Sequence, residues 1–244
     1  MPDNATTTRT YGRPPAAAPT LLTLVRHGQT PANVARLLSG VTDDPLTPFG
    51  ERQAAAMGAA LVSVIRDGTL PAVDALYVSP LQRARRTAAQ IAAPLGLTPV
   101  VRDALSEVNF GEIEGLTPEQ VGERYPHLAV AFAPVSESFE IAWPGGESRP
   151  QFHDRVRDVF AGIVAAHPAA HVVVVAHGGV LSAALAHYLA GDSRRWRDYT
   201  VGNCSLSRLT VAGEAVTLHC VNDLAYLDDL TPEEAEAVER IASQ

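Results

Sequence analysis

The chain reads LLTLVRHG over residues 21–28, an apolar run that ends in a histidine and a glycine. A second run of the same kind, HVVVVAHGG, occupies residues 171–179. Short continuous apolar runs are typical of strands that are buried on both faces of a parallel sheet. The two runs therefore predict two central parallel strands, each of which delivers a histidine at its carboxyl end.

The rest of the chain alternates between helical and extended patterns. The patterns predict helices over residues 51–66, 81–93 (stopped by Pro94), 152–164 and 180–190. They predict further strands over 74–78 and 98–101, and a hairpin at the sheet edge over 205–211 and 214–221. Strands that alternate with helices indicate a mainly parallel sheet with helices on both faces. The expected fold class is α/β, as a single-domain three-layer sandwich.

One folded domain is expected over residues 21–230, because 244 residues fit one large domain and no linker separates two cores. Residues 1–20 are polar and rich in Thr, Ala and Pro, which predicts a flexible N-terminal leader. Periodicity is lost around residues 105–146, where we expect a lid or insertion of short helices. The sequence TPEE at 231–234 offers an N-cap, a proline at the first helical position and a capping-box glutamate, so it predicts a C-terminal helix over 231–244.

Composition excludes several classes of function. The formal net charge of −8 argues against binding to nucleic acid or to an anionic membrane. All 19 basic residues are arginine, so the chain has no lysine for a Walker P-loop or for a Schiff base. No apolar run approaches the roughly 18 residues of a membrane span, and the N-terminus lacks the apolar segment of a secretion signal. A cytoplasmic location is the expectation.

The two histidines form the candidate site. The carboxyl ends of parallel strands lie at one edge of a sheet, so His27 and His177 can face each other across one pocket. The glycines after them expose backbone N–H groups, and Arg26 adds a cation suited to phosphate, which together indicate a phosphoryl site. Two hydrogen-bonded structural histidines explain the pattern equally well. Metal binding is disfavoured, because no HxxxH or HExxH motif or acidic cluster accompanies either histidine and Arg26 would repel a cation.

A set of motifs follows a fixed order from residue 21 to about residue 205, most of the chain. It comprises LVRHGQT at 24–30 with Asn33, DPLT at 44–47 with Gly50, SPLQRA at 79–84 with Thr87 and Ala88, LSE at 105–107 with FG at 110–111 and EG at 114–115, PGGES at 144–148, VVAHGG at 174–179, and Asn203 with Ser205. This ordered set resembles the histidine phosphatase superfamily, in its phosphoglycerate-mutase-like branch.

This resemblance implies a phosphoglycerate-mutase-like fold and a role for each matching residue. His27 would be the nucleophile that takes the phosphoryl group, and Glu107 would serve as general acid and then as general base. The phosphate oxygens would be held by Arg26, Arg83 and His177, with further hydrogen bonds from Asn33 and the amide of Gly178. No metal and no cofactor is implied. Glu112 and Glu114 are rivals for the acid role, interpreted instead as solvated or helix-start residues.

A phosphatase is favoured over a mutase. Mutases of this family carry a longer insertion rich in Arg and Lys, whereas residues 116–143 contain only Arg124 and His127 as possible cations. The chain also has Asn109-Phe110-Gly111 where the mutase motif has His-Tyr-Gly. We therefore expect hydrolysis of a small phosphomonoester, with a small phosphorylated metabolite as partner and a homodimer as one possible assembly. The alternatives are a phosphoglycerate-type mutase and a non-catalytic domain that binds a phosphorylated ligand.

Overall fold

The computed structural model describes residues 18–132 and 139–230. Residues 1–17 of the leader expected over 1–20, and the C-terminal helix expected from residue 231, lie outside the described residues, whereas Thr20 already belongs to the first strand. The strands are β1 (Thr20–Arg26), β2 (Ala75–Val78), β3 (Val100–Val101), β4 (His171–Ala176), β5 (Leu206–Ala212) and β6 (Ala215–Asp223). The α-helices are α1 (Pro31–Val34), α2 (Pro48–Arg66), α3 (Gln82–Leu95), α4 (Pro118–Arg124), α5 (Arg149–Ala166) and α6 (Gly178–Ala190).

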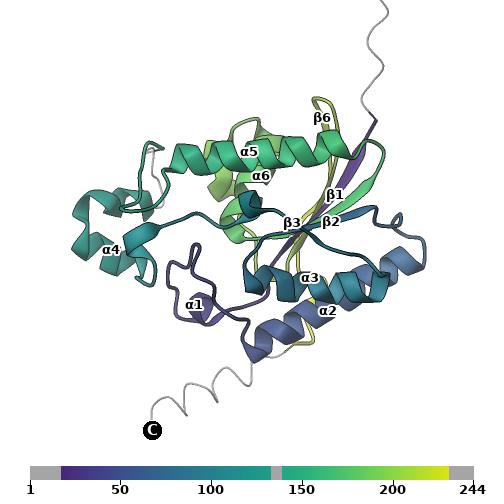
Figure 1. The fold of residues 1–244 in the computed structure, drawn as a ribbon, viewed down its shortest axis with the longest axis horizontal. Coiled ribbons are helices and arrows are strands. Elements are labelled where there is room, and N and C mark those ends of the chain that lie inside the picture. Colours follow the sequence, from purple (N-terminus) through teal and green to yellow (C-terminus); the bar gives the residue numbers. More distant parts are fainter. Residues whose placement is uncertain (1–17, 133–138, 231–244) are drawn as a thin grey trace, which may run out of the picture.

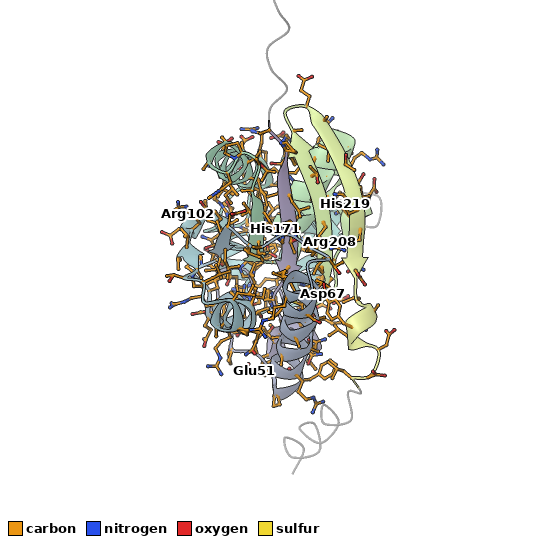
Figure 2. The ribbon with its side chains drawn as sticks, turned by 90° about the vertical axis from the view of Figure 1, so that its right-hand side faces the viewer. Glu51, Asp67, Arg102, His171, Arg208 and His219 are labelled. Carbon is orange, nitrogen blue, oxygen red and sulfur yellow. The ribbon has the colours of Figure 1, made fainter. Side chains whose placement is uncertain are left out.

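Within the described ranges, the strands form one sheet in the order β3-β2-β4-β1-β5-β6. The pairs β2–β3, β2–β4 and β1–β4 are parallel, and β5 and β6 add an antiparallel hairpin at the edge. Figure 2 follows this order across the molecule, from Arg102 just after β3 through His171 on β4 to His219 on β6. The mainly parallel sheet and the edge hairpin agree with the sequence prediction.

Helices cover both faces of the sheet. In Figure 1, α5 and α6 lie over one face, and α2 and α3 lie over the other. The side chains of β4 alternate between the two apolar cores, with Val172 and Val174 on the α5/α6 side and Val173 and Val175 on the α2/α3 side. This double burial explains the unbroken apolar run in the sequence.

The described part of the segment between β3 and α5 contains several short helical pieces. It contains 3-10 turns over Asp103–Leu105, Gly111–Ile113 and Pro126–Phe132, together with α4. Figure 1 shows α4 well to one side of the sheet, beyond the carboxyl ends of the parallel strands. Two further 3-10 segments, Ser193–Tyr199 and Ala225–Leu227, follow α6 and β6.

Helix α3 ends later than the sequence predicted. Pro94 was expected to stop it, but the helix continues to Leu95 with Pro94 inside its last turn. The end is set by Gly96, which takes a left-handed conformation with φ of 66° and directs its amide to carbonyls of the last turn. Glycine adopts the left-handed conformation with the least steric strain, so Gly96 marks the end of the helix more accurately than Pro94 does.

Candidate active site

The parallel pairing of β1 with β4 brings the two histidines together. Arg26 and Ala176 are register partners at the carboxyl ends of these strands, so His27 and His177 follow side by side. The backbone N–H of His27 donates to the Ala176 carbonyl at 3.0 Å. The two imidazole rings have their centroids 5.1 Å apart.

The ring of His27 is held in one tautomer. Its Nδ1 lies 2.7 Å from the carbonyl oxygen of Gly28, which can only accept, so Nδ1 carries the proton. Burial lowers the pKa of His27 well below its usual value, and the positive charges of Arg26 and Arg83 lower it further. At neutral pH the ring is therefore neutral, with an unprotonated Nε2 available as a nucleophile.

The ring of His177 is fully buried and bonds protein groups through both nitrogens. Its Nδ1 accepts from Nε of Arg83 at 3.3 Å, and its Nε2 donates to the Ser79 hydroxyl at 2.7 Å. Burial lowers the pKa of His177, as do the neighbouring His27 and arginines. The resemblance had implied a direct contact between His177 and phosphate. In this structure the ring links Arg83 on α3 to Ser79 at the end of β2, and the direct contact with phosphate stays a prediction.

Arg26 and Arg83 supply positive charge from two different elements. Arg26 donates through Nη1 to the Val201 carbonyl, while its buried Nε has no partner in the described part of the chain. Arg83 is 2% exposed and donates to the carbonyl oxygens of Gly40 and Thr42 at 2.6 Å. Arg83 is thus anchored to the loop before α2 as well as to His177.

Glu107 lies at the N-terminus of α6. Its Oε2 accepts from the backbone N–H of Gly179 at 2.8 Å, and its Oε1 accepts from Val108 N–H at 3.0 Å. A Cβ added at Gly179 would lie 2.5 Å from Oε1, so only glycine lets the carboxylate approach this closely. These contacts fix one acid beside the two arginines, whose charges interact with it.

A cavity of about 150 Å³ collects most of these groups. We call it the histidine cavity; its described lining includes Arg26, His27, Asn33, Arg83, Glu107 and Phe110. Asn33 uses Oδ1 to accept from Thr30 N–H and Asn203 Nδ2, so these bonds do not use its Nδ2 donors. His177 and Gly178 are not among the described lining residues, and the His177 ring lies next to that of His27. A nucleophilic imidazole, two guanidinium groups and one carboxylate around a small space suit phosphoryl transfer.

Glu114 has a role that the sequence analysis missed. Its carboxylate accepts from Val41 N–H at 2.9 Å and Thr42 N–H at 2.8 Å, and it also accepts from the Thr42 hydroxyl. Glu114 thus accepts from the N–H of Thr42, and Arg83 donates to the carbonyl oxygen of the same residue, so both side chains fix the backbone at Thr42. Glu114 was interpreted as a solvated or helix-start residue, but the loop at residues 41–42 folds onto its carboxylate. Glu112 is exposed and lies in the first turn of Gly111–Ile113, as the same interpretation expected.

Arg155 on α5 also had no sequence signal. It donates to the carbonyl oxygens of Ala104 and Ser106 at 2.9 and 2.8 Å, and it forms an ion pair with Glu147 at 2.6 Å. These bonds fix the segment that leads into Glu107. Arg155 can be recognised as a positioning residue only from these contacts, which join segments far apart in the sequence. Its partner Glu147 belongs to the PGGES motif.

Two further features are absent from the described residues. The described residues contain no group of three or more His, Cys, Asp or Glu side chains that could hold a metal ion. Over the same residues, every helix is too short or too polar to cross a membrane.

Comparisons with known proteins agree with the geometry. The family model of the histidine phosphatase superfamily (branch 1) matches residues 22–224. The chain is 33% identical over 195 residues to the uncharacterized phosphatase PhoE of Bacillus subtilis (strain 168), covering 80% of this chain and 90% of that protein. It is 35% identical over 165 residues to the metal-independent phosphoserine phosphatase of Arabidopsis thaliana, covering 67% and 66% of the two chains.

Solved structures give the same result. A mycobacterial glucosyl-3-phosphoglycerate phosphatase superposes with a TM-score of 0.70 at 30% identity, covering 84% of this chain and 99% of that chain. The alpha-ribazole phosphatase from Shigella flexneri superposes with a TM-score of 0.73 at 26% identity, covering 84% and 97%. These relatives are phosphatases with different named substrates.

Proposed function

Because the chain belongs to the histidine phosphatase superfamily (branch 1), we propose that it is a metal-independent phosphatase that hydrolyses a small phosphomonoester through a phosphohistidine on His27. The observation that carries the proposal is the histidine cavity, where the unprotonated Nε2 of His27 meets Arg26, Arg83 and Glu107. We also propose that the substrate is a small phosphorylated metabolite and that the enzyme acts in the cytoplasm.

The proposed reaction has two steps. First, Nε2 of His27 attacks phosphorus, the P–O bond to the alcohol breaks, and Glu107 donates a proton to the leaving oxygen. Second, water attacks the phosphohistidine, Glu107 takes the proton from the water, and the P–N bond breaks to release inorganic phosphate. Arg26 and Arg83 stabilise the charge that spreads over the phosphoryl oxygens in both steps.

The test is phosphate release from p-nitrophenyl phosphate in the presence of EDTA, with wild-type protein and His27→Ala. We expect turnover by the wild type and none by His27→Ala. After an alkaline quench, mass spectrometry should find one phosphoryl group on the peptide that contains His27. His219→Ala is the matched control, because His219 is exposed on β6 and is not among the described lining residues of the cavity.

Three other outcomes would refute the proposal. Full activity in His27→Ala excludes His27 as the nucleophile. Isomerisation of phosphoglycerate that outpaces phosphate release would favour a mutase. Tight binding of phosphorylated ligands without turnover would favour a non-catalytic domain.

A further inference from the structure

A second cavity of about 210 Å³ adjoins the histidine cavity. The two share Glu107 and Phe110, which line both. We call the second one the aromatic cavity. Its described lining includes Phe132, Trp143, Phe152, Trp196, Arg149 and His153.

Packed rings form the walls of the aromatic cavity. Trp143 makes an edge contact with Phe110, at 5.2 Å between centroids, and stacks on Phe132 at 5.7 Å. The guanidinium of Arg149 lies over the rings of Trp143 and Trp196, at 5.7 and 5.9 Å. Flat apolar walls of this kind bind rings well.

The aromatic cavity lies where a leaving group would emerge. In an in-line displacement the leaving oxygen departs on the side of phosphorus opposite the nucleophile. The acid that protonates this oxygen must lie within hydrogen-bond reach of it. Glu107 borders both cavities, so the group attached to the leaving oxygen would pass Glu107 and enter the aromatic cavity.

We propose that the aromatic cavity is the binding site for the alcohol part of the substrate, and that the enzyme prefers phosphate monoesters of apolar alcohols that carry a single ring. This inference rests on the proposed function. In another protein, an engineered cavity of about 150 Å³ with apolar walls binds benzene. The aromatic cavity, at about 210 Å³, therefore has room for one ring with a short substituent. A sugar would bury several hydroxyl groups against mostly aromatic walls, where Trp143 Nε1 and His153 Nδ1 are buried polar atoms without a partner among the described residues, too few to replace all of its hydrogen bonds to water.

The sequence offers Arg124 and His127 as the possible cations of the insertion over residues 116–143. Arg124 and His127 are exposed on that insertion and do not line the aromatic cavity, whereas Arg149 reaches it from α5. A substrate with a carboxylate is therefore the competing class. The structure favours a ring, since both indoles lie against the Arg149 guanidinium and make this part of the wall aromatic.

The first experiment compares kcat/KM for benzyl phosphate, glucose 6-phosphate and O-phosphoserine. All three are esters of primary alcohols, so differences report the binding of the alcohol rather than the chemistry. We expect benzyl phosphate to exceed the other two by at least about tenfold. Phe132→Ala should remove most of this preference, and the matched lid variant Tyr125→Ala should keep it. Equal values for the three esters, a preference for O-phosphoserine, or equal losses in Phe132→Ala would overturn the inference.

The second experiment separates this inference from the proposed function. Calorimetry measures the affinities of benzylphosphonate and methylphosphonate, which need no turnover. Binding of benzylphosphonate that is at least about tenfold tighter supports the aromatic cavity even if the protein hydrolyses nothing. Equal affinities overturn the inference even if the protein is an active phosphatase.

Discussion

His27 and His177 lie with their ring centroids 5.1 Å apart and hold their protons on opposite ring nitrogens. Nδ1 of His27 donates to the Gly28 carbonyl, whereas Nδ1 of His177 accepts from Arg83. His27 consequently presents an unprotonated Nε2, whereas the Nε2–H of His177 donates a hydrogen bond to the Ser79 hydroxyl. The pair thus consists of one available imidazole and one that is fixed by its neighbours.

Removing the Ser79 hydroxyl should loosen His177. Ser79→Ala leaves the buried Nε2–H of His177 without its acceptor, so we expect the free energy of unfolding to fall by about 1–3 kcal/mol. Misplacement of His177 and Arg83 should lower kcat by about tenfold or more. Urea denaturation and steady-state kinetics measure the two effects. Ser63→Ala, on the exposed side of α2, should change neither, and equal behaviour of the two variants would contradict the role of Ser79.

Glu114 should position Arg83 through the loop that both residues hold. In Glu114→Gln an amide NH₂ replaces one of the oxygens that accept from Val41 and Thr42, so the loop loses a charge-assisted bond. We expect KM to rise by about tenfold and the unfolding free energy to fall by about 1–3 kcal/mol. Glu112→Gln is the matched control, since Glu112 is exposed and bonds Tyr125. If Glu112→Gln has the same effect, the loop contact is not the cause.

Glycine at position 179 should be required for the approach of Glu107. The Cβ in Gly179→Ala would lie 2.5 Å from Oε1 of Glu107, which forces the carboxylate away. A general acid contributes about 10²- to 10⁴-fold, so kcat should fall within that range. Gly162→Ala on α5 is the control, because a Cβ there meets nothing within 4 Å. It should leave kcat unchanged and stabilise the protein by about 0.5–1 kcal/mol.

The pH dependence of kcat/KM should reflect a neutral His27. Because burial and two arginines lower the pKa of His27 well below 6.5, the nucleophile loses activity by protonation only at pH values below 6.5. The measurement is kcat/KM across the acid range, corrected for the phosphate ester, whose second pKa lies near 6. An acid limb at or above pH 6.5 that persists after this correction would contradict the assignment.

The free energy of unfolding should fall in mild acid. Burial lowers the pKa of His153 to about 4 and also lowers the pKa values of His27, His171 and His177. The unfolded chain, with histidine pKa values near 6.5, therefore binds more protons than the folded chain below that pH. The stabilisation from neutral histidines is complete above pH 6.5 and is lost as the pH falls toward 4. Urea midpoints at pH 7.5 and pH 5 test this, and equal midpoints would contradict it.

Local patterns in the sequence predicted the order of the elements. The doubly buried strand β4 needs an unbroken apolar run, and 171–176 has one. His27 could be named from the end of an apolar strand, and Glu107 and Arg83 from motifs that resemble those of the histidine phosphatase superfamily, before any coordinates. The end of α3 was misplaced because two local signals competed, and the left-handed Gly96 decided it.

Contacts between distant segments required the tertiary structure. Glu114 bonds a loop more than 70 residues away, and Arg155 bonds the segment before Glu107 from about 50 residues further along the chain. Arg149 contacts both Trp143 and Trp196, which lie in different segments of the chain, so the contact depends on how these segments pack together. Sequence periodicity reports which face of an element is buried, because that depends on neighbours in the chain. It does not report which polar side chain reaches which distant partner, because that depends on how the packed elements are placed in space.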